Sequence, residues 1–79
     1  MKVKLDGVRR IAIYGEYIRL DTLLKLANIT STGGEAKLRI QNGEVFVDGA
    51  PCTMRGKKIR PDNIVRFGRE TLLVKTTTT

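Results

Sequence analysis

The sequence contains no histidine and only one cysteine, Cys52. Without histidine, the usual zinc-binding sets and the Ser-His or Cys-His pairs of nucleophilic enzymes cannot form. The commonest general base near neutral pH is missing too. A single cysteine excludes an internal disulfide, and we expect Cys52 to be a reduced, packed thiol. The composition therefore predicts a protein that is not an enzyme, with no cofactor, metal or small-molecule substrate.

Long apolar segments are also absent. No run approaches the roughly 20 residues that span a bilayer, and the N-terminal MKVKLDGVRR lacks the apolar centre of a signal peptide. No lysine-rich helix carries Trp or Phe on an opposite apolar face, which disfavours binding to a membrane surface. We therefore expect a cytoplasmic protein with no membrane partner.

Acidic residues are few compared with basic ones. Lys and Arg number 15 and Asp and Glu 8, so the 79-residue chain has a net charge of +7. A chain of this length suits a single domain, residues 1–79, whose excess charge must reach the surface and attract polyanions. Nucleic acid is the first candidate partner.

A first helix is predicted over residues 20–28. Four apolar residues recur there at helical spacing and share one face: Leu20, Leu23, Leu24 and Ala27. Asp21 lies in the first turn, where a negative charge suits the helix dipole, and Asn28 can close the helix.

A second helix is predicted over residues 33–42. Thr32 and Glu35 have the spacing of a capping box, and Asn42-Gly43 is a typical stop signal. Ala36 and Ile40, four residues apart, are expected to face the core.

The remaining residues predict a small, mostly antiparallel sheet, which makes the fold class α+β. Alternation on either side of Asp6-Gly7 indicates an N-terminal strand or hairpin over residues 3–13. Asp48-Gly49 follows Val45 and Val47 and predicts a hairpin.

Two further strands are expected near 64–67 and 72–74, around a turn at Gly68, and Pro61-Asp62-Asn63 has the composition of a turn. The tail at 76–79 is expected to fray.

The segment STGGEAK at 31–37 raises the question of a phosphate site. It fails the pattern of nucleotide-hydrolysing loops, which need G-x-x-x-x-G-K-[ST]. Gly33 and Gly34 instead leave the amides of a helix start open, and such amides attract anions. The alternative is that the two glycines only permit a tight turn and close packing of the helices.

The segment RGKKIR carries four basic residues, expected on a loop between strands: Arg55, Lys57, Lys58 and Arg60. This density of like charge causes repulsion that a polyanion would relieve, although a basic run is often only a solvated surface. Tyr14 and Tyr17 could stack on bases, but tyrosines at the end of an apolar run are more often partly buried packing residues.

Taken together, RLDTLLKLANITSTGGEAKLRIQNGEVFVDG resembles the S-four (S4) RNA-binding domain, named after a protein of the small ribosomal subunit. The resemblance covers residues 18–67 and is strongest to small stand-alone bacterial members. The matching positions are Arg19-Leu20-Asp21, Thr32, Ala36-Lys37, Ile40, Gly43, Val45, Val47 and Asp48-Gly49.

The resemblance implies two helices packed on a small sheet. It also implies that RNA is held by the start of the second helix, by the neighbouring face of the first helix, and by basic residues of the following sheet and loop. By position, it implies RNA contacts at Thr32, Gly33, Gly34, Lys37 and the 55–60 segment. In this family an arginine follows the serine that corresponds to Thr32, whereas this sequence has Gly33, so that side-chain contact to phosphate is missing.

We therefore expect a non-catalytic, ribosome-associated protein that binds structured RNA, ribosomal or transfer RNA. Two alternatives remain open at this point. One is a protein-interaction module whose basic face recognises an acidic partner, and the other is DNA binding.

Overall fold

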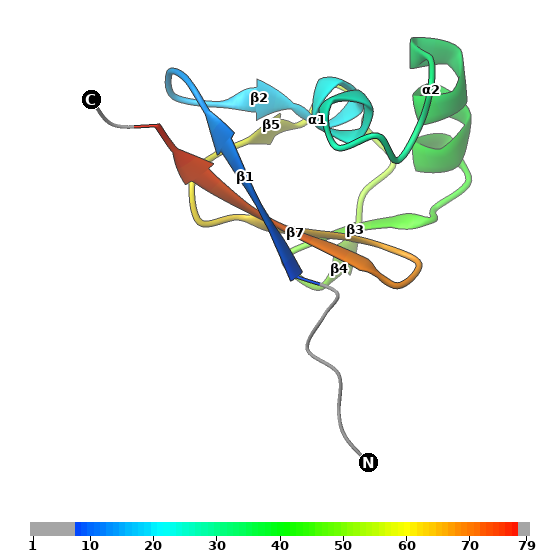
Figure 1. The fold of residues 1–79 in the computed structure, drawn as a ribbon. Coiled ribbons are helices and arrows are strands. Elements are labelled where there is room, and N and C mark those ends of the chain that lie inside the picture. Colours follow the sequence, from blue (N-terminus) through cyan, green and yellow to red (C-terminus); the bar gives the residue numbers. More distant parts are fainter. Residues whose placement is uncertain (1–7, 78–79) are drawn as a thin grey trace.

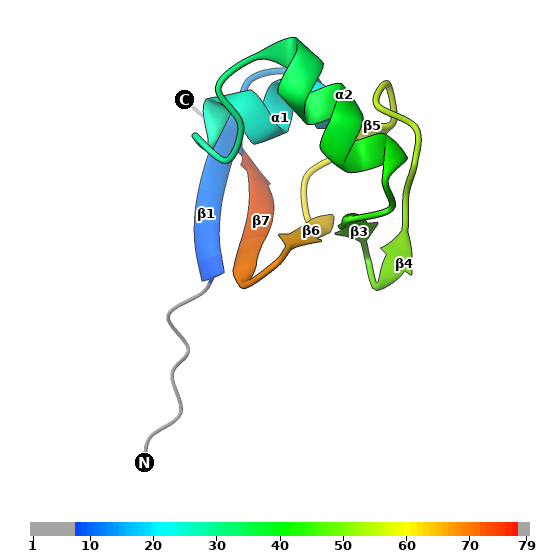
Figure 2. The same cartoon turned by 90° about the vertical axis from the view of Figure 1, so that its right-hand side faces the viewer.

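Residues 8–77 form two helices and two β-sheets in the computed structural model (Figure 1). The elements in chain order are β1 (Val8–Ile13), β2 (Ile18–Arg19), α1 (Leu20–Leu26), α2 (Gly33–Gln41), β3 (Val45–Val47), β4 (Ala50–Pro51), β5 (Lys58–Ile59), β6 (Ile64–Phe67) and β7 (Glu70–Thr76). Figure 2 shows both helices and β5 in a layer above the larger sheet. The predicted α+β class is confirmed.

The larger sheet has five strands in the order β1-β7-β6-β3-β4. Every neighbouring pair is antiparallel except β1 and β7, which run parallel with Val8 opposite Thr71 and Ile13 opposite Thr76. The prediction of a mostly antiparallel sheet with an N-terminal strand is confirmed. Strands β2 and β5 form a separate antiparallel pair.

The first and last strands of the described chain, β1 and β7, pair with each other. The tail expected to fray from residue 76 is in part tied down, because Thr76 belongs to β7 and the Thr77 N–H donates to the Ile13 carbonyl at 2.8 Å. This contact depends on β1, which is distant in sequence. The earlier part of the N-terminal prediction, Val3 to Gly7, lies outside the described residues.

The β3–β4 hairpin has the predicted two-residue turn. Asp48 and Gly49 have φ angles of 51° and 88°, the left-handed values that a tight turn of this type requires at both positions. The Asp48 carboxylate also accepts hydrogen bonds from the Ile64 N–H at 2.9 Å and from Asn63 Nδ2 at 2.7 Å. One side chain therefore fixes the hairpin against the start of β6.

Both helices end within two residues of the predicted positions. Asn28 has a φ of 62°, and its N–H donates to the Lys25 carbonyl at the end of α1. Gly43 has a φ of 78° and donates to the Ile40 carbonyl at the end of α2. Among residues 8–77 no helix has the length and apolar character to cross a membrane.

The core lies between the helices and the sheets. The helices contribute the side chains that the periodicity predicts, Leu20, Leu23, Leu24, Ala27, Ala36 and Ile40, and all are buried. Strands contribute Ile59, Val65, Leu72 and Val74, among others. Burying one such aliphatic side chain stabilises a fold by about 1.5–3 kcal/mol, so α1 is held by its apolar stripe although it has only seven residues. Cys52 is a half-buried free thiol packed against this core, as expected.

Candidate nucleic-acid interface

The start of α2 is capped by its own sequence. Thr32 is extended, and its Oγ1 accepts a hydrogen bond from the Glu35 N–H at 3.1 Å. Glu35 Oε1 in turn accepts from the Ser31 N–H at 2.9 Å. The predicted capping box is present, with the difference that the carboxylate reaches the amide of Ser31 rather than that of Thr32.

The two glycines at this helix start have open space around them. A Cβ atom added to Gly33 would meet nothing within 4 Å, and one added to Gly34 would meet only Thr32 Oγ1 at 3.9 Å. Neither glycine has a left-handed φ angle. Neither close helix packing nor a left-handed backbone therefore requires glycine at positions 33 and 34. What the glycines do is leave the amides of the first turn uncovered by side chains.

Lys37 lies on the same side of α2 as this turn. Positions three and four residues apart are neighbours on a helix surface, so Lys37 adjoins Gly33 and Gly34. Its side chain is exposed and forms no ion pair with any acid in the part of the chain that the structure describes. The helix start therefore combines uncovered amides with one free ammonium group.

The basic segment 55–60 is anchored to the start of α1. The carbonyls of Lys57 and Arg55 accept hydrogen bonds from the Leu20 N–H at 2.9 Å and the Asp21 N–H at 3.1 Å. These bonds satisfy amides that have no partner inside α1. The segment was expected to be a loop, which is only partly correct: Lys58–Ile59 is strand β5, paired with β2. That pairing was not predicted.

The β2–β5 pair has one buried side and one exposed side. Ile18 stands opposite Ile59, which is fully buried, so the residues before and after each isoleucine point outward. We call these four residues the outer face: Tyr17, Arg19, Lys58 and Arg60. Lys58 Nζ lies 5.0 Å from the centre of the Tyr17 ring, and the Arg60 guanidinium carbon lies 5.9 Å from it.

The expectation that both tyrosines are packing residues is wrong for Tyr14, which is 80% exposed, and holds only in part for Tyr17, which is 43% exposed. Tyr14 directly follows β1 and Tyr17 directly precedes β2, so both belong to the connection between these strands. The outer face therefore presents a partly exposed aromatic ring with two cations over it. Aromatic rings next to cations are a combination that binds unpaired bases in single-stranded nucleic acids.

One cation of the outer face is already engaged. The Arg19 guanidinium donates two hydrogen bonds to the Asp21 carboxylate, at 3.2 and 3.1 Å. Burial alone would raise the pKa of the Asp21 carboxyl, but the hydrogen bond and charge of Arg19, together with the donors of Thr22, outweigh it and lower that pKa. The pair fixes the start of α1 close to Gly56. A Cβ atom added to Gly56 would lie 3.8 Å from Arg19 Nη2.

The cations of the basic segment are not engaged in this way. All four side chains, those of Arg55, Lys57, Lys58 and Arg60, are exposed, and none forms an ion pair with an acid among residues 8–77. By contrast, Arg9, Arg39 and Lys75 each pair with a carboxylate. Five further cations, Arg10, Lys25, Lys37, Arg66 and Arg69, also form no ion pair among residues 8–77, so the distinction of the basic segment is that four unpaired cations lie within six consecutive residues.

The predicted site residues thus fall into two groups, both linked to α1. Helix α2 packs on α1, and the basic segment binds the first amides of α1. Within residues 8–77, no side-chain hydrogen bond or ion pair joins 32–37 to 55–60. The predicted site contains neither Arg19 nor Tyr17, although stacking of bases on Tyr17 is one of the two possibilities that the sequence raises. The sequence signal that could have revealed the outer face is a pattern shared by two tripeptides, Tyr17-Ile18-Arg19 and Lys58-Ile59-Arg60. In each, one isoleucine stands between two residues that point outward.

Comparison with known proteins gives two matches. A family model described as the S4 domain matches residues 11–75, which is wider than the 18–67 of the sequence resemblance because it includes much of β1 and β7. The chain is also similar to a Bacillus subtilis protein named as a probable ribosome maturation protein, RlbA. The two are 38% identical over 57 residues, which cover 72% of this chain and 80% of the relative.

Proposed function

Since the chain belongs to the S4 domain family, we propose that it is a non-catalytic protein that binds structured RNA through phosphates and shape. Ribosomal RNA is the first candidate, because the Bacillus subtilis relative is named as a probable ribosome maturation protein. Transfer RNA is the second. The protein would act in the cytoplasm, where ribosomes assemble.

The observation that carries this proposal is the set of exposed cations around Tyr17. Lys58 and Arg60 flank its ring at 5.0 and 5.9 Å and have no acidic partner among the described residues. Each would gain by contact with a phosphate, since bound phosphate releases condensed counterions. The Tyr17 ring, which is 43% exposed, offers a surface on which an unpaired base can stack.

The start of α2 supplies a second point of contact. We assign one backbone phosphate to the uncovered amides of Gly33 and Gly34, with Lys37 one turn further along. Anions are stabilised there by the helix dipole and by free N–H groups. In this chain the amides take the place of the arginine side chain that other family members carry at the position of Gly33, and the Thr32 hydroxyl is occupied by the cap.

The test is the salt dependence of binding to purified ribosomal RNA and transfer RNA. If about five phosphates are contacted, the slope of log affinity against log salt should be roughly −3.5 to −4.5. A flat salt response would contradict the proposal. Competition with DNA of matched sequence separates RNA binding from general polyanion binding, because contacts to the 2′-hydroxyl and the A-form groove are specific to RNA. A pull-down that survives nuclease treatment would favour an acidic protein partner instead.

A further inference from the structure

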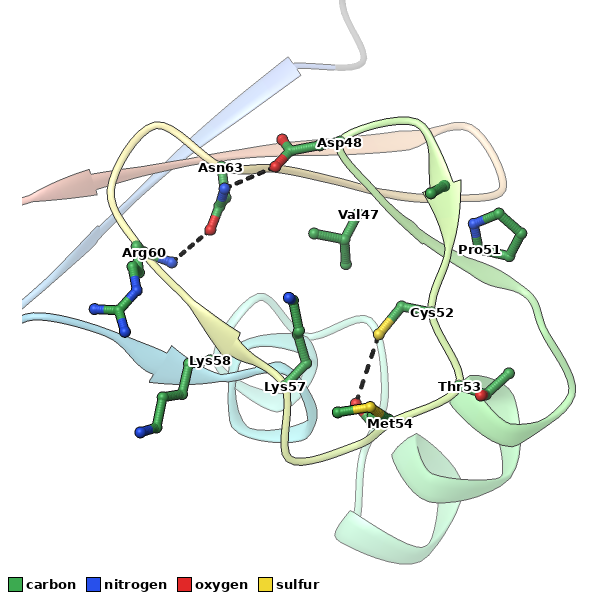
Figure 3. A pocket seen from close by; sticks show the side chains of 11 residues that line it. Val47, Asp48, Pro51, Cys52, Thr53, Met54, Lys57, Lys58, Arg60 and Asn63 are labelled. Atoms are coloured by element: carbon green, nitrogen blue, oxygen red, sulfur yellow. Dashed lines mark hydrogen bonds between the residues drawn. The ribbon is translucent and has the colours of Figure 1, made fainter.

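A hollow opens beside the outer face, between the β3–β4 hairpin and the segment that leads into β5 (Figure 3). Its volume is about 540 Å³, within the range of about 300–1,000 Å³ that is typical of small-ligand sites. In Figure 3 the side chains of Val47, Cys52 and Met54 lie on one side and those of Lys58 and Arg60 on the other. Lys57 reaches between the two sides.

The walls of this hollow are fixed by hydrogen bonds. Asn63 Nδ2 donates to the Asp48 carboxylate at 2.7 Å, and Asn63 Oδ1 accepts from the Arg60 N–H at 2.7 Å. On the opposite side, the Cys52 thiol donates to the Met54 carbonyl at 3.7 Å. These hydrogen bonds fix the walls of the cavity before a ligand enters, which reduces the conformational entropy that the protein loses on binding.

The charge of the lining is positive. It contains three cations, Lys57, Lys58 and Arg60, and one acid, Asp48, which gives 3 − 1 = +2. The Asp48 carboxylate is occupied by Asn63 and by the Ile64 N–H. The lining thus offers no free acid to the three ammonium and guanidinium groups, and an anion from outside would be needed to neutralise them.

We propose that the hollow takes one unpaired nucleotide of the bound RNA, with its base against Val47, Cys52 and Met54 and its phosphate at Lys57 and Lys58. This inference rests on the proposed function. An acidic side chain of a protein partner would pair with the cations but would not cover the apolar wall. An aliphatic side chain would cover the apolar wall but would leave the cations unpaired. A nucleotide has both an anionic phosphate and a weakly polar ring face.

The position of the hollow supports the same occupant. Lys58 and Arg60 line it and also flank Tyr17, so one strand can pass over the outer face and turn inward. A base inside a continuous duplex is stacked on both sides and cannot reach such a hollow, whereas a bulged base can be splayed out. The hollow therefore selects RNA with a bulge or loop over a regular helix.

The experiment compares two RNA hairpins that differ only by a single bulged 2-aminopurine. We expect the wild-type protein to bind the bulged hairpin about tenfold more tightly, a factor inside the range of about five- to 150-fold expected for one stacked base. The fluorescence of the 2-aminopurine and the NMR shift of the Met54 methyl group should both change on binding.

Met54→Ala removes an exposed part of the apolar wall and should reduce the preference for the bulge to less than about threefold, while affinity for the paired hairpin is kept. Val8→Ala is the matched control, because Val8 is 56% and Met54 62% exposed and β1 is the edge strand farthest from β4. Equal binding of both hairpins by the wild-type protein, or an undiminished preference in Met54→Ala, would overturn the nucleotide site alone. Failure of both hairpins to bind would overturn the proposed function with it.

Discussion

Replacing Lys57 and Lys58 together by alanine removes two free cations from the proposed RNA surface without touching the core. Both side chains are exposed, and neither forms an ion pair among the described residues. The Lys57 carbonyl that holds the start of α1 belongs to the backbone and remains in place. The change therefore tests charge separately from fold.

The expected magnitude follows from counterion release. With about five phosphate contacts, a fourfold rise in salt should weaken wild-type binding by about 130- to 500-fold. With two contacts removed, the slope falls to roughly −2.1 to −2.7, and the same rise in salt should weaken binding by only about 20- to 40-fold. The loss of affinity in the double variant should be similar for different RNA sequences, since phosphates carry no sequence information.

Stability should change little in this double variant. The loss of the Lys58 contact with Tyr17, at 5.0 Å, is the main structural effect, and an exposed contact of this kind is worth about 0.5–1 kcal/mol. For a domain of this size that corresponds to a fall of a few degrees in Tm. Thermal unfolding followed by circular dichroism measures this, and filter binding or fluorescence anisotropy at several salt concentrations measures the slope.

The matched control is Arg69→Ala with Lys75→Ala, which lowers the net charge from +7 by the same two units on the five-stranded sheet. Arg69 is exposed in the β6–β7 turn, and Lys75 forms an exposed ion pair with Asp62 at 3.1 Å. The control should leave the salt slope close to the wild-type value. An equal loss of slope in both double variants would refute the reasoning, because it would show that only the overall charge matters.

Three further predictions concern the starts of the two helices. Gly34→Asp should leave stability equal or higher, because an acid in the first turn suits the dipole, yet weaken RNA binding severalfold; Gly34→Ala, measured in the same titration, should weaken it much less. Glu35→Gln keeps an acceptor for the Ser31 N–H and removes a negative charge beside the assigned phosphate, so affinity should rise about two- to fivefold and an unchanged affinity would argue against a phosphate there. Because the pKa of Asp21 is lowered from its ordinary value of 3.8, its carboxylate stabilises the fold at pH values above 3.8, and this stability is lost as the pH falls through the folded-state pKa. Urea unfolding of Asp21→Asn should therefore show a deficit at pH 7 that shrinks at pH 3, and a deficit of equal size at both would exclude the Arg19 pair as its cause.

Local signals made much of the fold predictable. The cap of α2 needs only Thr32 and Glu35, three residues apart, and the β3–β4 turn needs only the Asp48-Gly49 pair. The apolar stripe of α1 is also contained in one short window. Each of these features is determined by residues that are neighbours in the chain, so a single sequence is enough to find it.

The outer face could not be predicted in the same way. Ile18 and Ile59 are 59 − 18 = 41 residues apart, and a two-residue strand such as β5 exists only through its partner. Without that register, Tyr17 and Arg19 are two unconnected residues of the N-terminal half. The basic residues of 55–60 were visible as a run, but their neighbours were not, since proximity across a sheet depends on register rather than on composition.

The parallel pairing of β1 with β7 has a consequence for the order in which the molecule is completed. Val8 pairs with Thr71, a separation of 71 − 8 = 63 residues, so β1 has no partner until nearly all of the described chain is available. Closing a loop of that length is slow compared with forming the helices and the hairpins between them. During synthesis, both helices, β2 and β5 are therefore made before β1 can pair, and the edge of the sheet stays open until β7 follows. That last strand also supplies the buried Leu72 and Val74, so the core is incomplete until it pairs.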